Sequence, residues 1–164
     1  MTNHKRHFNS KPEKMTDNRQ YLINYDSDRE VIPTDEELLI ASITDILWEL
    51  AKDKKEVHFN VLLQTVRARF GRQVRHGEFT DALWEVNEQS WEHHRVLLTA
   101  IVFGKHRIPG EAVFYQAKLL GAIDRYTLTK KVLTRITKTL KETIYDIAAQ
   151  KFSMINDGSN SIQE

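Results

Sequence analysis

The chain of 164 residues contains no cysteine, and this absence excludes several kinds of site. Without thiols there is no disulfide framework, no thiolate zinc site and no cysteine nucleophile, which fits a reducing compartment such as the cytoplasm. The chain also has no apolar run close to the roughly 20 residues that a membrane-spanning helix needs. Met1 to Asn24 has no apolar stretch of the kind found in secretory signals. We therefore expect a soluble, cytoplasmic protein that has no membrane partner.

Motifs for catalysis are absent as well. The six glycines form no Gly-rich phosphate loop and no Gly-x-Ser-x-Gly nucleophile elbow. Among the seven histidines, only His93 and His94 are adjacent. On a helix, adjacent side chains point about 100° apart, which is unsuited to sharing one metal ion. We expect a protein that is not an enzyme and that carries neither a metal nor a cofactor.

Charge of one sign is not in excess, because 24 Lys and Arg residues face 23 Asp and Glu residues, for a net charge of +1. An apolar content of 40% is enough for the core of one domain. Polar residues dominate 1–33, which we interpret as an N-terminal arm. We expect a folded domain over 34–121, an amphipathic basic helix over 122–152 and a polar tail over 153–164.

Helix signals begin directly after the arm. Thr34 and Glu37 have the spacing of a capping box, and the helix that they start is expected to end near the charged stretch that begins at Lys52. Asn60 is expected to cap a second helix, whose apolar side chains recur at helical spacing up to Gly71. The first half of the domain is therefore predicted to be helical.

The pattern changes at 96–103, which is a continuous run of β-branched, aliphatic and aromatic residues. Such a run is typical of a buried strand. The segment 104–110 is rich in turn residues, and 112–115 again favours a strand, so these segments predict a β-hairpin. Thr127 is then expected to cap a long final helix.

The order of these elements, with a short strand at 57–59 after the first helix, resembles the winged-helix superfamily over residues 34 to about 120. The segments 97–102, 108–110 and 113–115 also resemble a strand, Pro-Gly, aromatic pattern of small uncharacterised prokaryotic proteins. That second likeness implies no activity. The expected fold is α+β and mostly helical, with a winged-helix body, a β-hairpin wing and a long C-terminal helix.

The winged-helix resemblance implies that the third helix enters the major groove and that the wing contacts the backbone of the nucleic acid. We expect this third helix over about 78–93, where there is no Lys or Arg. Its acidic side chains are those of Glu78, Asp81, Glu85, Glu88 and Glu92. Because phosphates repel carboxylates, we do not expect this helix to read base sequence.

Basic side chains gather elsewhere in the chain. The span 57–77 contains no acid, and both the predicted wing and the final helix are basic. Arg and Lys can hold phosphates without reading bases. The sequence therefore predicts a regulatory nucleic-acid-binding protein whose phosphate contacts come from Arg67, Arg69, Arg72, Arg75, Lys105, Arg107, Lys131, Arg135 and Lys138. Runs of charge are also common on solvated helix faces, and this structural interpretation stays open.

Trp84 and Trp91 support an alternative of a different class. They lie seven residues apart on the acidic helix, and tryptophan is enriched at the centres of protein interfaces. They either pack under a neighbouring helix or bind a protein partner, in which case the chain is an interaction module or adaptor.

The apolar stripe of the final helix also has two interpretations. Leu133, Leu140 and Ile147 repeat at a spacing of seven, which is close to a coiled-coil seam. The stripe either packs on the domain of its own chain or forms the contact of a homodimer.

Overall fold

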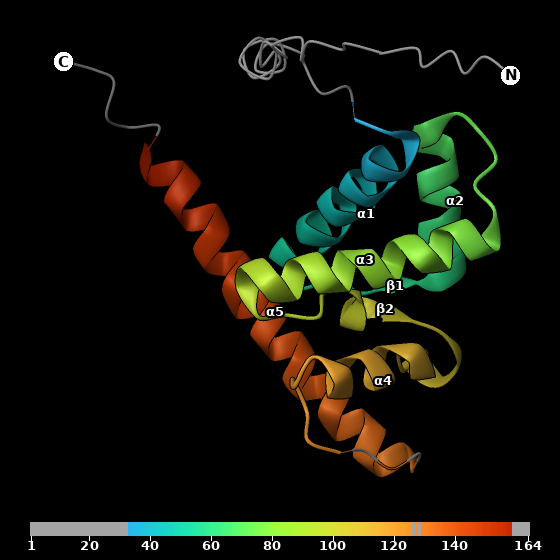
Figure 1. The fold of residues 1–164 in the computed structure, drawn as a ribbon. Helices are drawn as coiled ribbons and strands as arrows, with labels where there is room; N and C mark the ends of the chain where they lie inside the picture. Colours follow the sequence, from blue (N-terminus) through green and yellow to red (C-terminus); the bar gives the residue numbers. More distant parts are fainter. Residues whose placement is uncertain (1–32, 126, 128, 159–164) are drawn as a thin grey trace, which may run out of the picture. The chain divides into compact units, whose positions relative to one another are not determined.

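The computed structural model describes residues 33–125, 127 and 129–158, without the side chains of 155–158. The predicted N-terminal arm, apart from Pro33, and the predicted tail from residue 159 lie outside the described residues. The described residues belong to one compact unit that begins at Pro33. Figure 1 shows that this unit is mostly helical and has a small sheet of two strands, as an α+β fold requires.

The first helix, α1 (Asp35–Lys52), starts with the predicted capping box. The backbone N–H of Glu37 donates to Oγ1 of Thr34 at 3.2 Å, and the backbone N–H of Thr34 donates to Oε2 of Glu37 at 2.7 Å. The backbone N–H of Thr34 and its hydroxyl, which donates to the same Oε2 at 3.1 Å, hold the pKa of Glu37 below its ordinary value, because they favour the charged carboxylate. The capping-box prediction is therefore confirmed.

The next two helices are α2 (Phe59–Phe70) and α3 (His76–His94). His58, rather than the predicted Asn60, caps α2, since Nδ1 of His58 accepts the backbone N–H of Asn60 at 3.2 Å. Gly71 ends α2 as predicted, with a left-handed backbone at φ 64° that suits a residue without a Cβ.

The core is formed mainly by α1 and α3, which pack against each other, and α5 (Lys130–Gly158) packs against α1 (Figure 1). Apolar side chains at helical spacing supply this core, as the sequence pattern predicts. Side chains that are fully buried include those of Leu39, Ile43, Leu47, Leu62, Val66, Phe79, Val86 and Ile144.

The strand predicted at 96–103 is wrong over most of its length. Leu98–Ile101 forms a short 3₁₀ helix, η2, and only Val102–Phe103 forms a strand, β2. The run is apolar because it passes through the core, where 96–102 are all buried. Side chains of α3 satisfy its backbone: Asn87 Oδ1 accepts the N–H of Thr99 at 2.9 Å, and Ser90 Oγ donates to the carbonyl of Val96 at 3.0 Å.

The predicted hairpin is also wrong. The strand β2 pairs in parallel with β1 (Val57–His58), so that Val57 lies opposite Val102 and His58 opposite Phe103. The predicted return strand at 112–115 lies inside the helix α4 (Glu111–Leu119). Helical spacing places Phe114 and Ala117 in the interior, and this burial outweighs the β-favouring character of 113–115.

The final helix α5 differs from the prediction at both ends. It begins at Lys130, where the N–H of Leu133 donates to the carbonyl of Thr129 at 3.0 Å, so Thr127 is not its cap. It continues past the predicted end at residue 152 to Gly158. The helix that was predicted as a separate segment packs on α1 and on η2.

Candidate nucleic-acid interface and pocket

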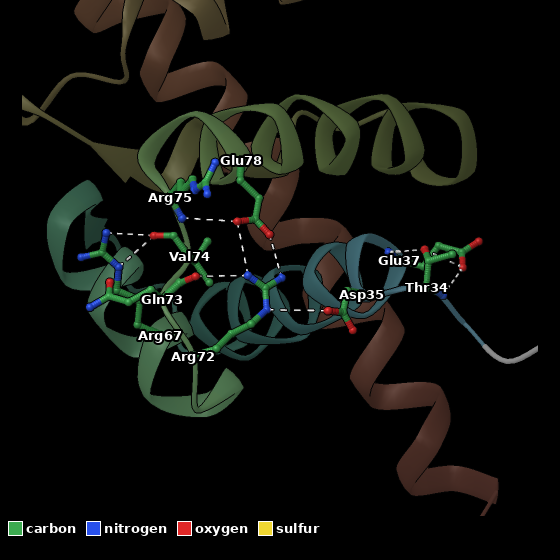
Figure 2. Close-up of polar contacts among 9 residues, drawn as sticks. All are labelled: Thr34, Asp35, Glu37, Arg67, Arg72, Gln73, Val74, Arg75 and Glu78. Atoms are coloured by element: carbon green, nitrogen blue, oxygen red, sulfur yellow. Dashed lines mark hydrogen bonds and ion pairs between the residues drawn. The ribbon is translucent and has the colours of Figure 1, made fainter.

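Arg67 uses its guanidinium to hold the loop between α2 and α3. Its Nε and Nη2 both donate to the backbone carbonyl of Val74, at 3.0 and 2.9 Å. Val74 is fully buried, and its carbonyl would need a partner in any case. The structure therefore places this predicted phosphate contact in a structural role (Figure 2).

Arg72, in the same region, also binds acceptors of its own chain. Its Nη2 lies 2.7 Å from Oε1 of Glu78 and its Nη1 lies 3.3 Å from Oε2, while its Nε lies 3.8 Å from Oδ2 of Asp35. The hydrogen bond from Arg72 is the main cause that holds the pKa of Glu78 below its ordinary value. Figure 2 shows this fork across the start of α3. Arg72 therefore neutralises the first carboxylate of the acidic helix.

The other two arginines of this span are more accessible. Arg69 is exposed and lies 3.8 Å from Oε2 of Glu49, which is a weak surface ion pair. Arg75 is exposed, and its side chain has no ion pair among the residues that the structure describes. In Figure 2 the dashed line at Arg75 comes from its backbone nitrogen, which donates to Glu78 at 3.3 Å.

The loop between β2 and α4, in which Lys105–Arg107 form a short 3₁₀ turn, exposes a second group of basic side chains. Lys105, His106 and Arg107 are all exposed, and none has an ion pair within the described part of the chain. The guanidinium carbon of Arg107 lies 5.4 Å from the centroid of the Phe103 ring, a distance that allows a cation–π contact. His106 and Arg107 have left-handed backbones, at φ 63° and 57°, which cost energy in residues with a Cβ.

These two basic regions meet around one pocket. A cavity of about 560 Å³ is lined by His76 from the start of α3 and by Lys105 from the loop after β2. We use the name basic rim for Arg75, His76, Lys105 and Arg107, of which His76 and Lys105 line this pocket directly. The carboxylate that lines the pocket is that of Glu111. Of the side chains that line the pocket, Lys105 carries a positive charge and Glu111 a negative one, and the cations Arg75 and Arg107 lie close to His76 and Lys105 in the sequence.

A polar network that sequence reasoning missed lies in the wall of the pocket. Asn87 Nδ2 donates to Thr99 Oγ1 at 2.7 Å and to Gln116 Oε1 at 2.8 Å. Gln116 Nε2 donates to the backbone carbonyl of Trp84 at 2.9 Å. Asn87, Thr99 and Gln116 are at most 2% exposed. The sequence held one signal of this network, which is the position of Asn87 on the apolar face of a helix. A polar side chain at such a position needs a buried hydrogen-bond partner.

The basic face of α5 is accessible. Lys131, Arg135 and Lys138 are exposed, and Lys138 Nζ lies 3.8 Å from Oε1 of Glu142 on the next turn. Such a pair at the surface contributes little to stability and leaves the lysine available. These three side chains form a second basic surface, on a helix apart from the basic rim.

The apolar stripe of α5 is only partly used by the body of the protein. Ile144 and Ala148 are fully buried, and Leu140 and Ile147 are half-buried against the core. Leu133 is half-buried without belonging to that core cluster. The packing of α5 on its own chain therefore accounts for the centre of the stripe, and a homodimer contact stays a prediction.

The tryptophans of α3 are both half-buried. Trp84 lines the pocket, donates from Nε1 to Oε1 of Glu88 at 2.8 Å, and has its ring centroid 6.3 Å from that of Tyr115. Trp91 lies under the guanidinium of Arg95, whose carbon is 5.7 Å from the ring centroid. Neither ring is fully exposed or fully in the core.

Comparison with family models, with curated proteins and with solved structures gave no match to this chain. Within the described ranges, no three His, Asp or Glu side chains gather in a way that could hold a metal ion. In the same ranges, none of the helices has both the length and the apolar character needed to cross a bilayer.

Proposed function

We propose that this protein binds nucleic acid through phosphate contacts made by the basic rim. The observation that carries the proposal is that Arg75, Lys105 and Arg107 are exposed and have no ion pair among the described residues. Arginine and lysine side chains of this kind bind phosphate oxygens by charge-assisted hydrogen bonds. Arg67 and Arg72, which hold their own chain, are left out of the proposed contacts.

The neighbouring acids support this choice of surface. Glu78 follows the rim on α3, and its carboxylate is bonded to Arg72 at 2.7 Å. A phosphate at the rim is therefore not repelled by a free Glu78. The remaining acids of α3 begin one turn further along the helix, at Asp81, and we do not assign that helix to base reading.

The strained backbone of the loop supports the proposal as well. Two consecutive residues with a Cβ, His106 and Arg107, adopt positive φ values beside Lys105. Such conformations persist where the surrounding structure holds the backbone in place, and they recur at ligand-binding sites. The loop is closed by the N–H of Gly104, which donates to the carbonyl of Ile108 at 3.0 Å. The loop therefore presents its cations from a defined position.

Fluorescence anisotropy with labelled single strands and duplexes, over a series of salt concentrations, tests the proposal. We expect binding that weakens steeply with salt and depends little on base sequence. A triple variant, Arg75→Ala, Lys105→Ala and Arg107→Ala, should reduce the slope of log affinity against log salt by roughly one for each phosphate that the variant no longer binds. A second variant, with Lys131, Arg135 and Lys138 changed to Ala, measures the contribution of α5.

The matched control removes three cations elsewhere, by the changes Lys54→Asn, Lys55→Ala and Lys118→Ala. All three are exposed and none belongs to either basic surface. A slope that falls equally in the control and in the rim variant would show only the effect of net charge, which contradicts the proposed contacts. Absence of binding to every oligonucleotide at low salt would contradict the function itself.

A protein contact is the second candidate function, and an exposed apolar patch on α4 favours it. Tyr115 is 51% exposed and Leu119 is 59% exposed, one turn apart, and the ring centroid of Tyr115 lies 6.3 Å from that of Trp84. Apolar side chains grouped at the surface mark interaction sites. Light scattering against protein concentration tests self-association: a mass that rises in the wild type and not in Tyr115→Ser, Leu119→Ser supports it, and a constant monomer mass contradicts it.

A further inference from the structure

The pocket beside the basic rim is rich in flat rings. Its lining includes the side chains of His58, Phe59, His76, Trp84 and Phe103, which come from β1, α2, α3 and β2. The ring of His58 meets that of Phe103 edge-on at 5.5 Å, and the ring of Phe59 lies 5.2 Å from that of His76. A volume of about 560 Å³ is within the range of small-molecule sites. Rings of this kind select a flat, aromatic ligand.

The wall of the pocket adds fixed hydrogen-bonding groups. The hydrogen bonds of Asn87 determine which way its amide faces, because Nδ2 donates to two acceptors while Oδ1 accepts the N–H of Thr99. The amide of Gln116 is then fixed in turn, with Oε1 toward Asn87 and Nε2 toward the carbonyl of Trp84. The second N–H of Gln116 Nε2 has no acceptor within the described part of the chain. The wall can therefore bond to the polar edge of a ring.

The groups at the basic rim indicate a third property of the ligand, which is its charge. His76 and Lys105 of the basic rim line the pocket together with His58 and one carboxylate, that of Glu111. Nδ1 of His58 accepts the N–H of Asn60, so the neutral ring carries its proton on Nε2 and remains a donor. Donors and a positive charge beside an aromatic pocket favour a ligand whose flat ring is joined to an anionic group.

We propose that this pocket binds one nucleotide, with the base among the rings and the phosphate at the basic rim. A lipid chain would leave the second N–H of Gln116 without an acceptor and would make no use of the charge of Lys105, and a sugar alone would leave the rings unused. The inference deepens the proposed function, on which it rests, because a base inside the pocket has to leave the stack of a duplex. The nucleotide comes either from a single strand or from solution.

The test uses the full chain and two labelled single strands of equal length, an oligothymidylate and the same backbone made of abasic residues. Both carry the same phosphates, so the comparison isolates the base. We expect the oligothymidylate to bind roughly tenfold more tightly, as the stacking of one base implies. We also expect it to bind more tightly than a duplex of the same length. Free thymidine and adenosine monophosphates form the second arm, measured by calorimetry.

A variant that fills the pocket provides the control. Ala112 is exposed on α4 and lines the pocket, so Ala112→Trp should occupy the space without removing a core side chain. Ala112→Ser is the matched change that leaves the space open, and thermal melting verifies that both variants fold. We expect Ala112→Trp to lose the preference for the base-bearing strand and to keep salt-dependent binding to the abasic strand. Ala112→Ser should keep both.

The possible outcomes separate this inference from the proposed function. Equal affinity of the wild type for the two strands, with steep salt dependence, would overturn the pocket and keep the phosphate contacts. If no strand binds, the proposed function fails, and the monophosphate arm decides: binding that Ala112→Trp abolishes supports a site for free nucleotides. No binding of monophosphates in that case overturns the inference. A base preference that Ala112→Trp leaves intact overturns it too.

Discussion

Two basic segments precede helices in this protein, and they differ in how many of their cations are bound within the chain. Around the loop 71–75, the guanidinium of Arg67, on the last turn of α2, holds a backbone carbonyl and that of Arg72 holds a carboxylate, while Arg75 is exposed. At the loop 104–110, Lys105 and Arg107 are exposed and have no ion pair among the described residues. In the sequence, both loops look like accessible basic runs.

The difference depends on which acceptors are within reach. The carbonyl of Val74 lies 2.9 and 3.0 Å from two nitrogens of Arg67, and the carboxylate of Glu78 lies 2.7 Å from Arg72. The ring of Phe103, which Arg107 approaches, attracts a cation without neutralising it. A cation that has found an acceptor in its own chain stabilises the fold, and one that has not is available to a partner.

The largest effect on stability should come from Arg67. Arg67→Ala removes two hydrogen bonds to the buried carbonyl of Val74, and we expect the free energy of unfolding to fall by about 1 to 3 kcal/mol. Arg107→Ala in the other loop should change it by no more than about 0.5 kcal/mol. Urea denaturation of both variants checks this. If both variants lost the same free energy of unfolding, the bound arginine would stabilise the fold no more than the exposed one, which would contradict the comparison.

A smaller effect should come from the left-handed backbone of each loop. Gly71 has φ 64°, and a Cβ there would meet no atom within 4 Å, so Gly71→Ala should cost about 1 kcal/mol through the backbone alone. His106 has φ 63° with a Cβ present. His106→Gly should raise stability by at most about 0.5 kcal/mol, because the unfolded chain also gains freedom.

Thermal melting of the two single variants measures these changes. A loss of stability in His106→Gly would show that the histidine side chain makes a contact that outweighs the backbone strain, and the loop would then resemble the first one. If Gly71→Ala were neutral, the end of α2 would tolerate a Cβ, and the contrast between the loops would disappear.

The smallest effect should appear as a dependence on pH. The pKa of Glu78 lies below its ordinary value of 4.5, mainly because Arg72 donates to it. The unfolded chain therefore binds a proton at this group before the folded chain does, so the stability that it contributes is present above pH 4.5 and is lost as the pH falls through the folded pKa. Glu78→Gln should remove this part of the acid sensitivity.

Melting temperatures between about pH 5 and about pH 3 show whether the slope becomes shallower in that variant. Glu92→Gln is the matched control, because Glu92 is exposed on the same helix and has no ion pair within the described residues. A slope that does not differ between the two variants would mean that the fork between Arg72 and Glu78 does not contribute to the folded state.

Several features of the fold could be predicted because they depend on a few adjacent residues. The capping box at Thr34 closes within a single turn. Gly71 ends its helix because of its own backbone freedom. The apolar spacing of α1 and α3 already indicates which side chains enter the core, since a helix brings residues three and four apart to one face.

The candidate site could be predicted only in part. The exposed cations at Lys105 and Arg107 were named from charge alone, and so were Arg67 and Arg72, whose acceptors the sequence does not reveal. The sequence did not predict the pocket, because its polar wall joins residues that are distant along the chain. Thr99 lies 12 residues after Asn87, and Gln116 lies 29 residues after it. Its rings come from four separate elements.

The sequence by itself determined the helices with strong local signals, the apolar faces and the absence of thiol chemistry. Tertiary structure alone decided that 98–101 is a 3₁₀ helix and that 112–115 is helical. A buried apolar run has the same composition whether its backbone bonds to a neighbouring strand or to side chains such as Asn87 and Ser90. The choice depends on which hydrogen-bond partner packing brings within reach, and that partner lies elsewhere in the chain.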